Sequence, residues 1–166
     1  MLFLKRALER LLLVLICVLL VIMVCLMLWQ VFTRYVLATP ALFTEETLRF
    51  TMIWMALLGT AYCFGTRRHL SLELVIHLCP PILQRILGVF NGLVSIAFAA
   101  LAMLMGGWQA SQSALTQLSP IMQISMGMVY LAVPVAAVLI ILLQGMNTLL
   151  IATGQTSPVD VPEETL

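Results

Sequence analysis

The residues RYVLATPALFTEETLRF, at positions 34–50, decide how this chain is organised. The stretch contains a proline and four charged residues, whereas the sequence on both sides of it is almost wholly apolar. A proline prevents one helix from running straight into the next. The stretch therefore predicts a polar turn between two apolar helices. Its charged residues are Arg34, Glu45, Glu46 and Arg49.

The composition indicates a membrane protein. Hydrophobic residues make up 63% of the 166 residues, and charged residues only 9%. A soluble domain carries about 25% charged residues. Too few polar side chains are present to cover a globule in water, so lipid must surround most of the chain. The net charge of +1 gives no indication of nucleic-acid binding.

Long intervals without charge predict four transmembrane helices in one all-α domain. A helix needs about 20 apolar residues to cross about 30 Å of hydrocarbon. The interval that follows Arg85 is long enough for two spans and is divided by the polar run QASQSALTQLSP at 109–120. A polar, acidic tail follows at 153–166. The predicted spans are residues 11–32, 50–65, 86–108 and 127–152.

The second predicted span is short, because its uncharged residues cover only about 25 Å. Three explanations stay open. Charged side chains at its ends could extend toward the interfaces, the bilayer could be locally thin, or another protein could cover the helix ends.

The positive residues predict the orientation. They precede the first span and lie between the second and third, and such residues mark the cytoplasmic side. Both termini are therefore expected in the cytoplasm, and residues 34–49 and 109–126 on the opposite side. The first apolar run is too long for a signal peptide and has no small-x-small cleavage site, which predicts a retained first helix. The residues concerned are Lys5, Arg6, Arg10, Arg67, Arg68 and Arg85.

The charge cluster at 34–49 has two interpretations. Thr44 is a candidate N-cap, with Glu45 and Glu46 in the first turn beside the positive end of the helix dipole. Arg49 can meet either glutamate on the helix surface, and Arg34 could reach a glutamate across the turn. The cluster is then a charge-compensated helix start, in which exposed pairs contribute about 0.2–1 kcal/mol, or a docking patch for another protein. Ion transport by the glutamates is disfavoured, since they lie at a helix end.

The segment HLSLELVIHLCPP at 69–81 predicts a short amphipathic helix, about 70–79, at the cytoplasmic interface. Arg67, Arg68 and His69 would anchor it there. His69, Glu73 and His77 share the spacing of metal ligands on a helix, but histidines outside the spans are poor haem ligands. We expect no metal and no cofactor.

The third span carries small residues at spacings of 4, 3, 4, 3 and 4. Such a stripe lets another helix approach closely, either within this chain or from another subunit. In the fourth span, Pro134 predicts a kink or weakened backbone bonding. The stripe consists of Gly88, Gly92, Ser95, Ala99, Ala102 and Gly106.

No charged residue lies near the centre of any predicted span. An ion-coupled carrier places ionisable groups or broken helices at the membrane midplane. Their absence favours an accessory subunit, and we expect no enzyme activity. Two alternatives are a membrane anchor of a redox enzyme, which needs haem-ligating histidines within spans, and a self-assembling channel or exporter, which needs a polar line along a pore.

The segment QVFTRYVLATPALFTEETLRFTMIWMALLGTAYCFGTRRHLSLELV resembles the small membrane subunit, DctQ-like, of tripartite ATP-independent periplasmic (TRAP) transporters. Phe43 stands where that family often has tryptophan. The later MGMVYLAVPV, with Tyr130 and Pro134, also resembles the family. The matching residues are Arg34, Tyr35, Phe43, Thr44, Glu45, Glu46, Arg49, Trp54, Leu58, Gly59, Arg67, Arg68 and His69.

The resemblance implies an assembly in the bacterial inner membrane. A large multi-spanning subunit moves the substrate, coupled to an ion gradient that is usually sodium. A periplasmic substrate-binding protein delivers an organic anion, such as a dicarboxylate or sialic acid. The present chain would be the four-helix partner that supports the large subunit.

Overall fold

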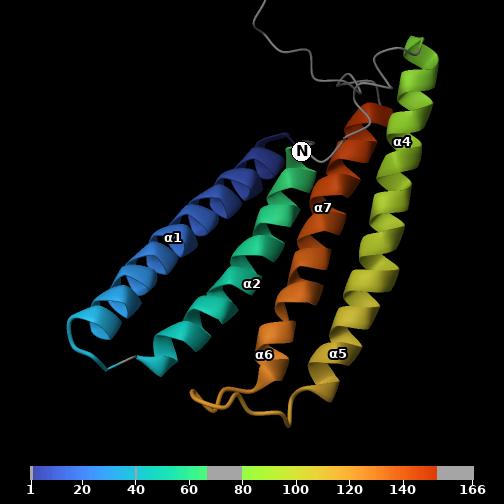
Figure 1. The fold of residues 1–166 in the computed structure, drawn as a ribbon. Coiled ribbons are helices and arrows are strands. Elements are labelled where there is room, and N and C mark those ends of the chain that lie inside the picture. Colours follow the sequence, from blue (N-terminus) through green and yellow to red (C-terminus); the bar gives the residue numbers. More distant parts are fainter. Residues whose placement is uncertain (1, 40, 67–79, 153–166) are drawn as a thin grey trace, which may run out of the picture.

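A computed structural model describes residues 2–39, 41–66 and 80–152, and its long elements are all helices (Figure 1). The expected all-α class is confirmed, because the described residues include four helical runs long and apolar enough to cross a membrane. The elements are α1 Leu2–Tyr35, α2 Leu42–Gly65, α4 Pro81–Phe98, the π-helix η1 Ala99–Gly106, α5 Gly107–Ser113, α6 Met126–Tyr130 and α7 Ala132–Ala152.

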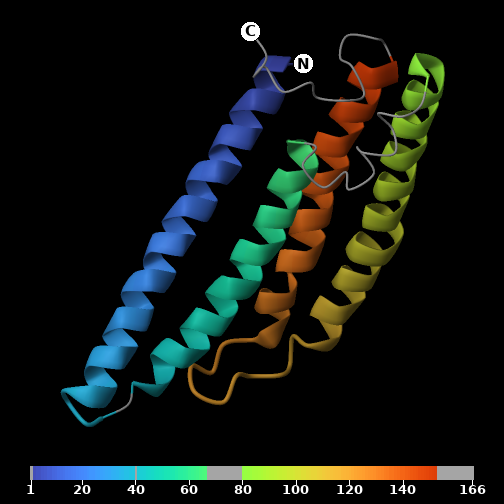
Figure 2. The same ribbon diagram turned by 45° about the horizontal axis from the view of Figure 1, so that its top comes forward.

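The four runs lie in a row. Figures 1 and 2 show the order α1, α2, α7, α4 from one edge to the other, and α4 continues through η1 into α5. Accordingly, α1 packs on α2, α2 on α7, and α7 on both α4 and η1. Only 6% of the most apolar window of α1 is buried, compared with 44% for the α6–α7 run. The edge helix α1 therefore leaves most of its surface for lipid or for another protein.

Two small clusters of buried residues hold the row together. One joins Leu12 of α1 to Leu58 of α2 and Leu143 of α7. The other consists of Ala61, Ala99 and Ile140, from α2, η1 and α7. Alanines at such contacts allow helices to approach closely, which is how helices associate when lipid surrounds them.

The helix α2 is longer than the predicted second span. It begins at Leu42, well before Phe50, and its 24 residues extend about 36 Å. The expected boundary assumed that a span ends at its first charged residue. Here the charged first turns belong to the helix, and Thr44 and Glu46 in these turns are buried.

The fourth run is interrupted where the proline predicted weakness. The helix α6 ends at Tyr130 and α7 begins at Ala132, with Leu131 between them. Pro134 has no N–H to donate to the carbonyl of Tyr130, four residues earlier, and its ring crowds that carbonyl. The sequence therefore places the interruption correctly.

The predicted interfacial helix at 70–79 lies outside the described residues. So do its proposed anchors Arg67, Arg68 and His69, and the tail at 153–166.

Candidate partner-docking site

One end of the row is formed by two connections, residues 36–41 and 114–125, which we call the loop end. The first connection returns the chain from α1 to α2 within six residues. Ala38 adopts a φ of 51°, in the left-handed region that residues with a Cβ rarely occupy. The N–H of Thr39 also donates to the carbonyl of Thr33 at 3.2 Å. This tight turn fixes the end of α1 opposite the start of α2.

The predicted N-cap is wrong. The residue before the helix is Ala41, which gives no side-chain cap. Because α2 starts two residues before Thr44, this threonine lies inside the first turn. Its hydroxyl is fully buried and donates to the carbonyl of Ala41 at 2.6 Å.

Glu46, near the start of α2, holds the second connection of this end. Its side chain is buried, with 7% of the residue exposed, and its carboxylate accepts a hydrogen bond from the backbone N–H of Met122 at 2.7 Å. A hydrogen bond to an ionised acceptor is about twice as strong as a neutral one. The neighbouring Thr47 hydroxyl lies 3.3 Å from the sulfur of Met122. The second connection is thus held directly against α2.

The second connection also has internal order. The N–H of Ser119 donates to the carbonyl of Ile124 at 2.9 Å, and that of Met126 to the carbonyl of Gln117 at 2.8 Å. The hydroxyl of Ser111 donates to the carbonyl of Gly127 at 2.8 Å. With the bond from Glu46, these contacts make the loop end a fixed surface.

Glu45 and Arg49 form the second part of the charge cluster. Their side chains are 3.8 Å apart and 59% and 70% exposed. An exposed pair of this kind contributes little to stability. Both charges are consequently available at the surface of α2.

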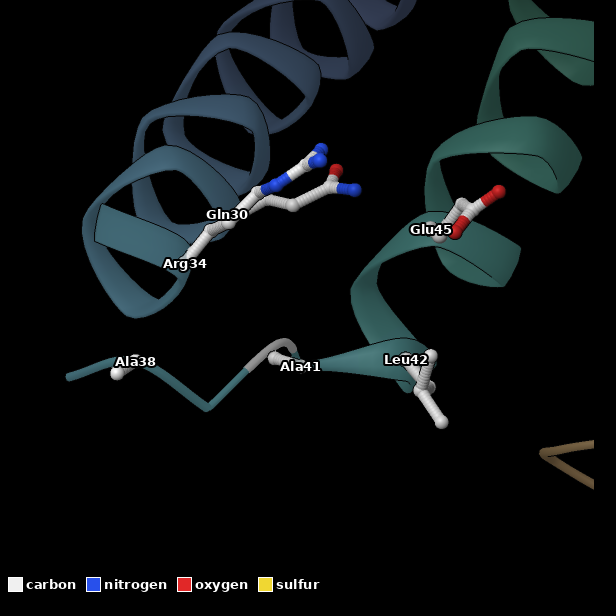
Figure 3. Close-up of a pocket in the computed structure, with 6 residues that line it drawn as sticks. All are labelled: Gln30, Arg34, Ala38, Ala41, Leu42 and Glu45. Carbon is white, nitrogen blue, oxygen red and sulfur yellow. The ribbon is translucent and has the colours of Figure 1, made fainter.

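Arg34 is the third part of the cluster. Figure 3 shows Arg34 and Gln30 extending from α1 toward the space beside α2, across which Glu45 lies. Within the described residues Arg34 forms no ion pair; its guanidinium carbon lies 5.9 Å from the centre of the Tyr35 ring. The open pocket here measures about 400 Å³ and is lined by Gln30, Arg34, Ala38, Ala41, Leu42 and Glu45.

The four predicted charges therefore do not act as one group. Glu46 is internal, Glu45 and Arg49 form an exposed pair, and Arg34 lines a pocket without an ion pair among residues 2–39, 41–66 and 80–152. The loop end is thus an ordered surface that carries exposed charges. Within the described residues no group of histidine, cysteine or carboxylate side chains could hold a metal ion.

The small-residue stripe is divided by η1. Gly92 and Ala99 are buried, Gly88 and Ser95 are half-buried, and the last two members, Ala102 and Gly106, are exposed. A π-helix forms i→i+5 hydrogen bonds and holds more residues in each turn than an α-helix. The inward face therefore moves by one residue after Ala99.

Met103 and Gly107 occupy the inward positions that the stripe assigned to Ala102 and Gly106. Met103 packs against the cluster around Ala99, and Gly107 is buried. A Cβ on Gly107 would lie only 2.8 Å from Val133 of α7. The contact with α7 is thus within the chain, and the exposed small residues face outward.

Sequence reasoning missed a polar cluster in the last turns of α7. Asn147 is 1% exposed, and its Nδ2 donates to the carbonyls of Phe64 and Gly65, each at 3.0 Å. These carbonyls belong to the last two residues of α2, where a helix runs out of its own N–H donors. The signal was the run QGMNT at 144–148, whose polar residues fall three and four apart within an apolar helix.

Comparison with known proteins agrees with this architecture. Residues 23–154 match the family described as tripartite ATP-independent periplasmic transporters, DctQ component. The chain is also 30% identical over 139 residues to a Haemophilus influenzae protein named "Putative TRAP transporter small permease protein", and the match covers 83% of each chain.

Proposed function

Since the chain belongs to the DctQ family of TRAP transporter components, we propose that it scaffolds a large multi-spanning subunit and helps to dock a periplasmic substrate-binding protein. The assembled transporter would take up an organic anion, such as sialic acid or a C4-dicarboxylate, coupled to an ion gradient, most simply of sodium. In this account the chain itself carries neither substrate nor ion.

The exposed surface of α1 supports the scaffolding role. Only 6% of its most apolar window is buried within the chain. A static partner needs a broad surface of this kind, because lipid-embedded helices associate through close packing. The outward-facing Ala102 and Gly106 offer a second place where a neighbouring helix could approach closely.

The loop end supports the docking role, and the bond between Glu46 and Met122 is the observation that carries it. A docking surface binds best when its geometry is fixed before the partner arrives. That bond fixes residues 114–125 against α2, beside the exposed charges of Arg34, Glu45 and Arg49. Charges at the rim of an interface mainly steer encounter and set register.

The orientation follows from the same proposal. The loop end faces the periplasm, and both termini lie in the cytoplasm of a bacterium. The reason is that segments rich in lysine and arginine, such as the one before the first span, stay on the cytoplasmic side. Arg67, Arg68 and His69 would then lie at the cytoplasmic interface.

Reconstitution tests the proposed division of labour. Proteoliposomes would contain a large TRAP membrane subunit from the same bacterium, the present chain, or both, with the substrate-binding protein outside. Uptake driven by a sodium gradient is expected only when both subunits are present. Uptake by this chain alone would contradict the proposal and favour a self-assembling channel.

A further inference from the structure

A second charged site lies at the opposite end of the row, between the beginning of α1 and the end of α2. It is a pocket of about 190 Å³, which is smaller than the 300–1,000 Å³ typical of sites for whole drug-sized ligands. A headgroup-sized chemical group therefore suits it. The lining residues are Arg6, Glu9, Arg10, Leu13, Tyr62 and Thr66.

The pocket carries excess positive charge. Glu9 is its acidic member, and Lys5 lies 3.4 Å from the Glu9 carboxylate, with both side chains less than one-fifth exposed. The negative charge is thus compensated within α1. Arg6 and Arg10 are exposed, lie one turn apart, and form no ion pair within the described residues.

Hydrogen-bond donors at the pocket are also unused. Across residues 2–39, 41–66 and 80–152, neither arginine nor the hydroxyl of Tyr62 has a hydrogen-bond partner. Thr66 differs, since its hydroxyl donates to the carbonyl of Tyr62 at 3.1 Å. Two guanidinium groups and one phenol can accordingly donate to a bound anion.

Arg10 also borders an apolar groove on the same helix. The groove measures about 470 Å³ and is otherwise lined by Leu11, Val14, Leu15 and Val18. These side chains are between 42% and 62% exposed in the chain. The groove begins at the charged pocket and follows α1 toward the membrane interior, as an acyl chain does.

We infer that Arg6, Arg10 and Tyr62 bind the phosphate of an anionic phospholipid, whose acyl chain lies in the groove along α1. Arginine presents a fork of donors that matches phosphate geometry. Basic pockets between transmembrane helices bind anionic headgroups. The excess positive charge favours a lipid with net negative charge over a zwitterionic lipid, and the adjoining groove favours a lipid over free phosphate.

Native mass spectrometry of the full chain tests this site. The protein is released from bicelles that contain equal amounts of phosphatidylglycerol and phosphatidylcholine, and the retained lipid is counted. The wild type should retain phosphatidylglycerol preferentially. Each arginine near an anionic lipid contributes about fivefold. Arg6→Gln together with Arg10→Gln should therefore lower the preference about 25-fold.

Two further variants keep the test specific. Arg49→Gln removes an exposed arginine at the loop end and should retain the wild-type preference. Tyr62→Phe keeps the packing of the ring, removes only the hydroxyl, and should weaken retention by less than the double variant. Helical content from circular dichroism must be unchanged in all of them, so that a loss of lipid is not a loss of fold.

Four results would overturn the inference. The first is equal retention of the two lipids by the wild type, and the second is an equal loss of bound lipid in Arg49→Gln and in the double variant. The third is displacement of the lipid by inorganic phosphate, which would show that free phosphate binds as well as the lipid. The fourth is a rise in retention when Asp160, Glu163 and Glu164 are all neutralised, which would assign the pocket to the acidic tail instead.

Discussion

The carboxylate of Glu46 accepts a hydrogen bond from the backbone N–H of Met122 at 2.7 Å, across 76 positions of the sequence. The bond joins the beginning of α2 to the connection between α5 and α6. It therefore holds residues 114–125 against α2, and Glu45 and Arg49 on the same helix carry exposed charges.

Replacing this acceptor should loosen the loop end. Glu46→Ala would leave the N–H of Met122 without a partner in a partly buried setting, which costs about 1–3 kcal/mol. Thermal unfolding of the purified protein in mild detergent measures the loss, and limited proteolysis should show earlier cleavage within residues 114–125. Glu46→Gln keeps an oxygen acceptor and should lie between the wild type and the alanine variant.

The adjacent glutamate supplies the matched control. The side chain of Glu45 is 59% exposed and forms an ion pair with Arg49, so Glu45→Ala should change the free energy of unfolding by less than about 0.5 kcal/mol. Equal effects of Glu45→Ala and Glu46→Ala would show that the bond to Met122 does not hold the loop.

Arg34→Gln should affect docking and leave assembly intact. The side chain has no ion pair within the described residues and faces an open pocket, so its removal costs the chain little. Loss of a rim charge slows association and reduces its salt dependence, with an effect of about fivefold or less. Uptake should fall at low concentrations of the binding protein and recover at saturating ones.

Loss of the large subunit from purified Arg34→Gln complexes would contradict that prediction. Uptake equal to that of the wild type at every concentration of the binding protein would contradict it too. Gln30→Ala, in the same pocket but without charge, serves as the control.

Substitution of two glycines by alanine in the continuous α4–η1 helix should change stability in opposite directions. A Cβ at Gly92 would overlap the hydroxyl of Thr148, a stiff side chain that donates to the carbonyl of Gln144 at 2.8 Å. Gly92→Ala should therefore destabilise the protein by about 1–3 kcal/mol. Nothing lies within 4 Å of a Cβ at Gly106. Gly106→Ala should stabilise the isolated chain by about 0.4–1 kcal/mol.

Rescue of the first variant makes this test specific. Thr148→Ala removes the overlapping hydroxyl, so the double variant with Gly92→Ala should regain stability relative to the two single losses added together. Simple additivity in thermal unfolding would show that Gly92 does not meet Thr148.

Asn147 should be important to the end of α2. Asn147→Leu removes two donors from the carbonyls of Phe64 and Gly65 and should lower the free energy of unfolding by about 1–3 kcal/mol. Gln109 is an exposed amide elsewhere on a helix, and Gln109→Leu should have little effect. A similar, small effect of both substitutions on thermal unfolding would contradict the capping role.

The sequence predicted the four runs because charge is costly in lipid, so gaps between charges mark spans directly. It also predicted the interruption near Pro134, because that constraint is local. The packing of the third run was less predictable. A stripe with spacings of three and four assumes α-helical turns, and η1 changes which residues face inward after Ala99.

The candidate site was predictable in position and not in detail. Residues 34–49 indicated charges at a helix start, and the structure does bring Glu45 and Arg49 together. The partner of Glu46 is a backbone N–H in a distant loop, and a backbone group leaves no side-chain signature in a sequence. The N-cap was wrong for a different reason, since Ala41 precedes α2 without a side-chain cap and so carries no capping signature in the sequence.

In the proposed function this chain works as a subunit beside a large membrane protein. The most direct measurement is affinity purification of the tagged chain from its native membrane in mild detergent, followed by mass spectrometry. We predict a large multi-spanning membrane protein in near-equal amount. Recovery of this chain alone, under conditions in which other membrane complexes stay intact, would contradict the claim.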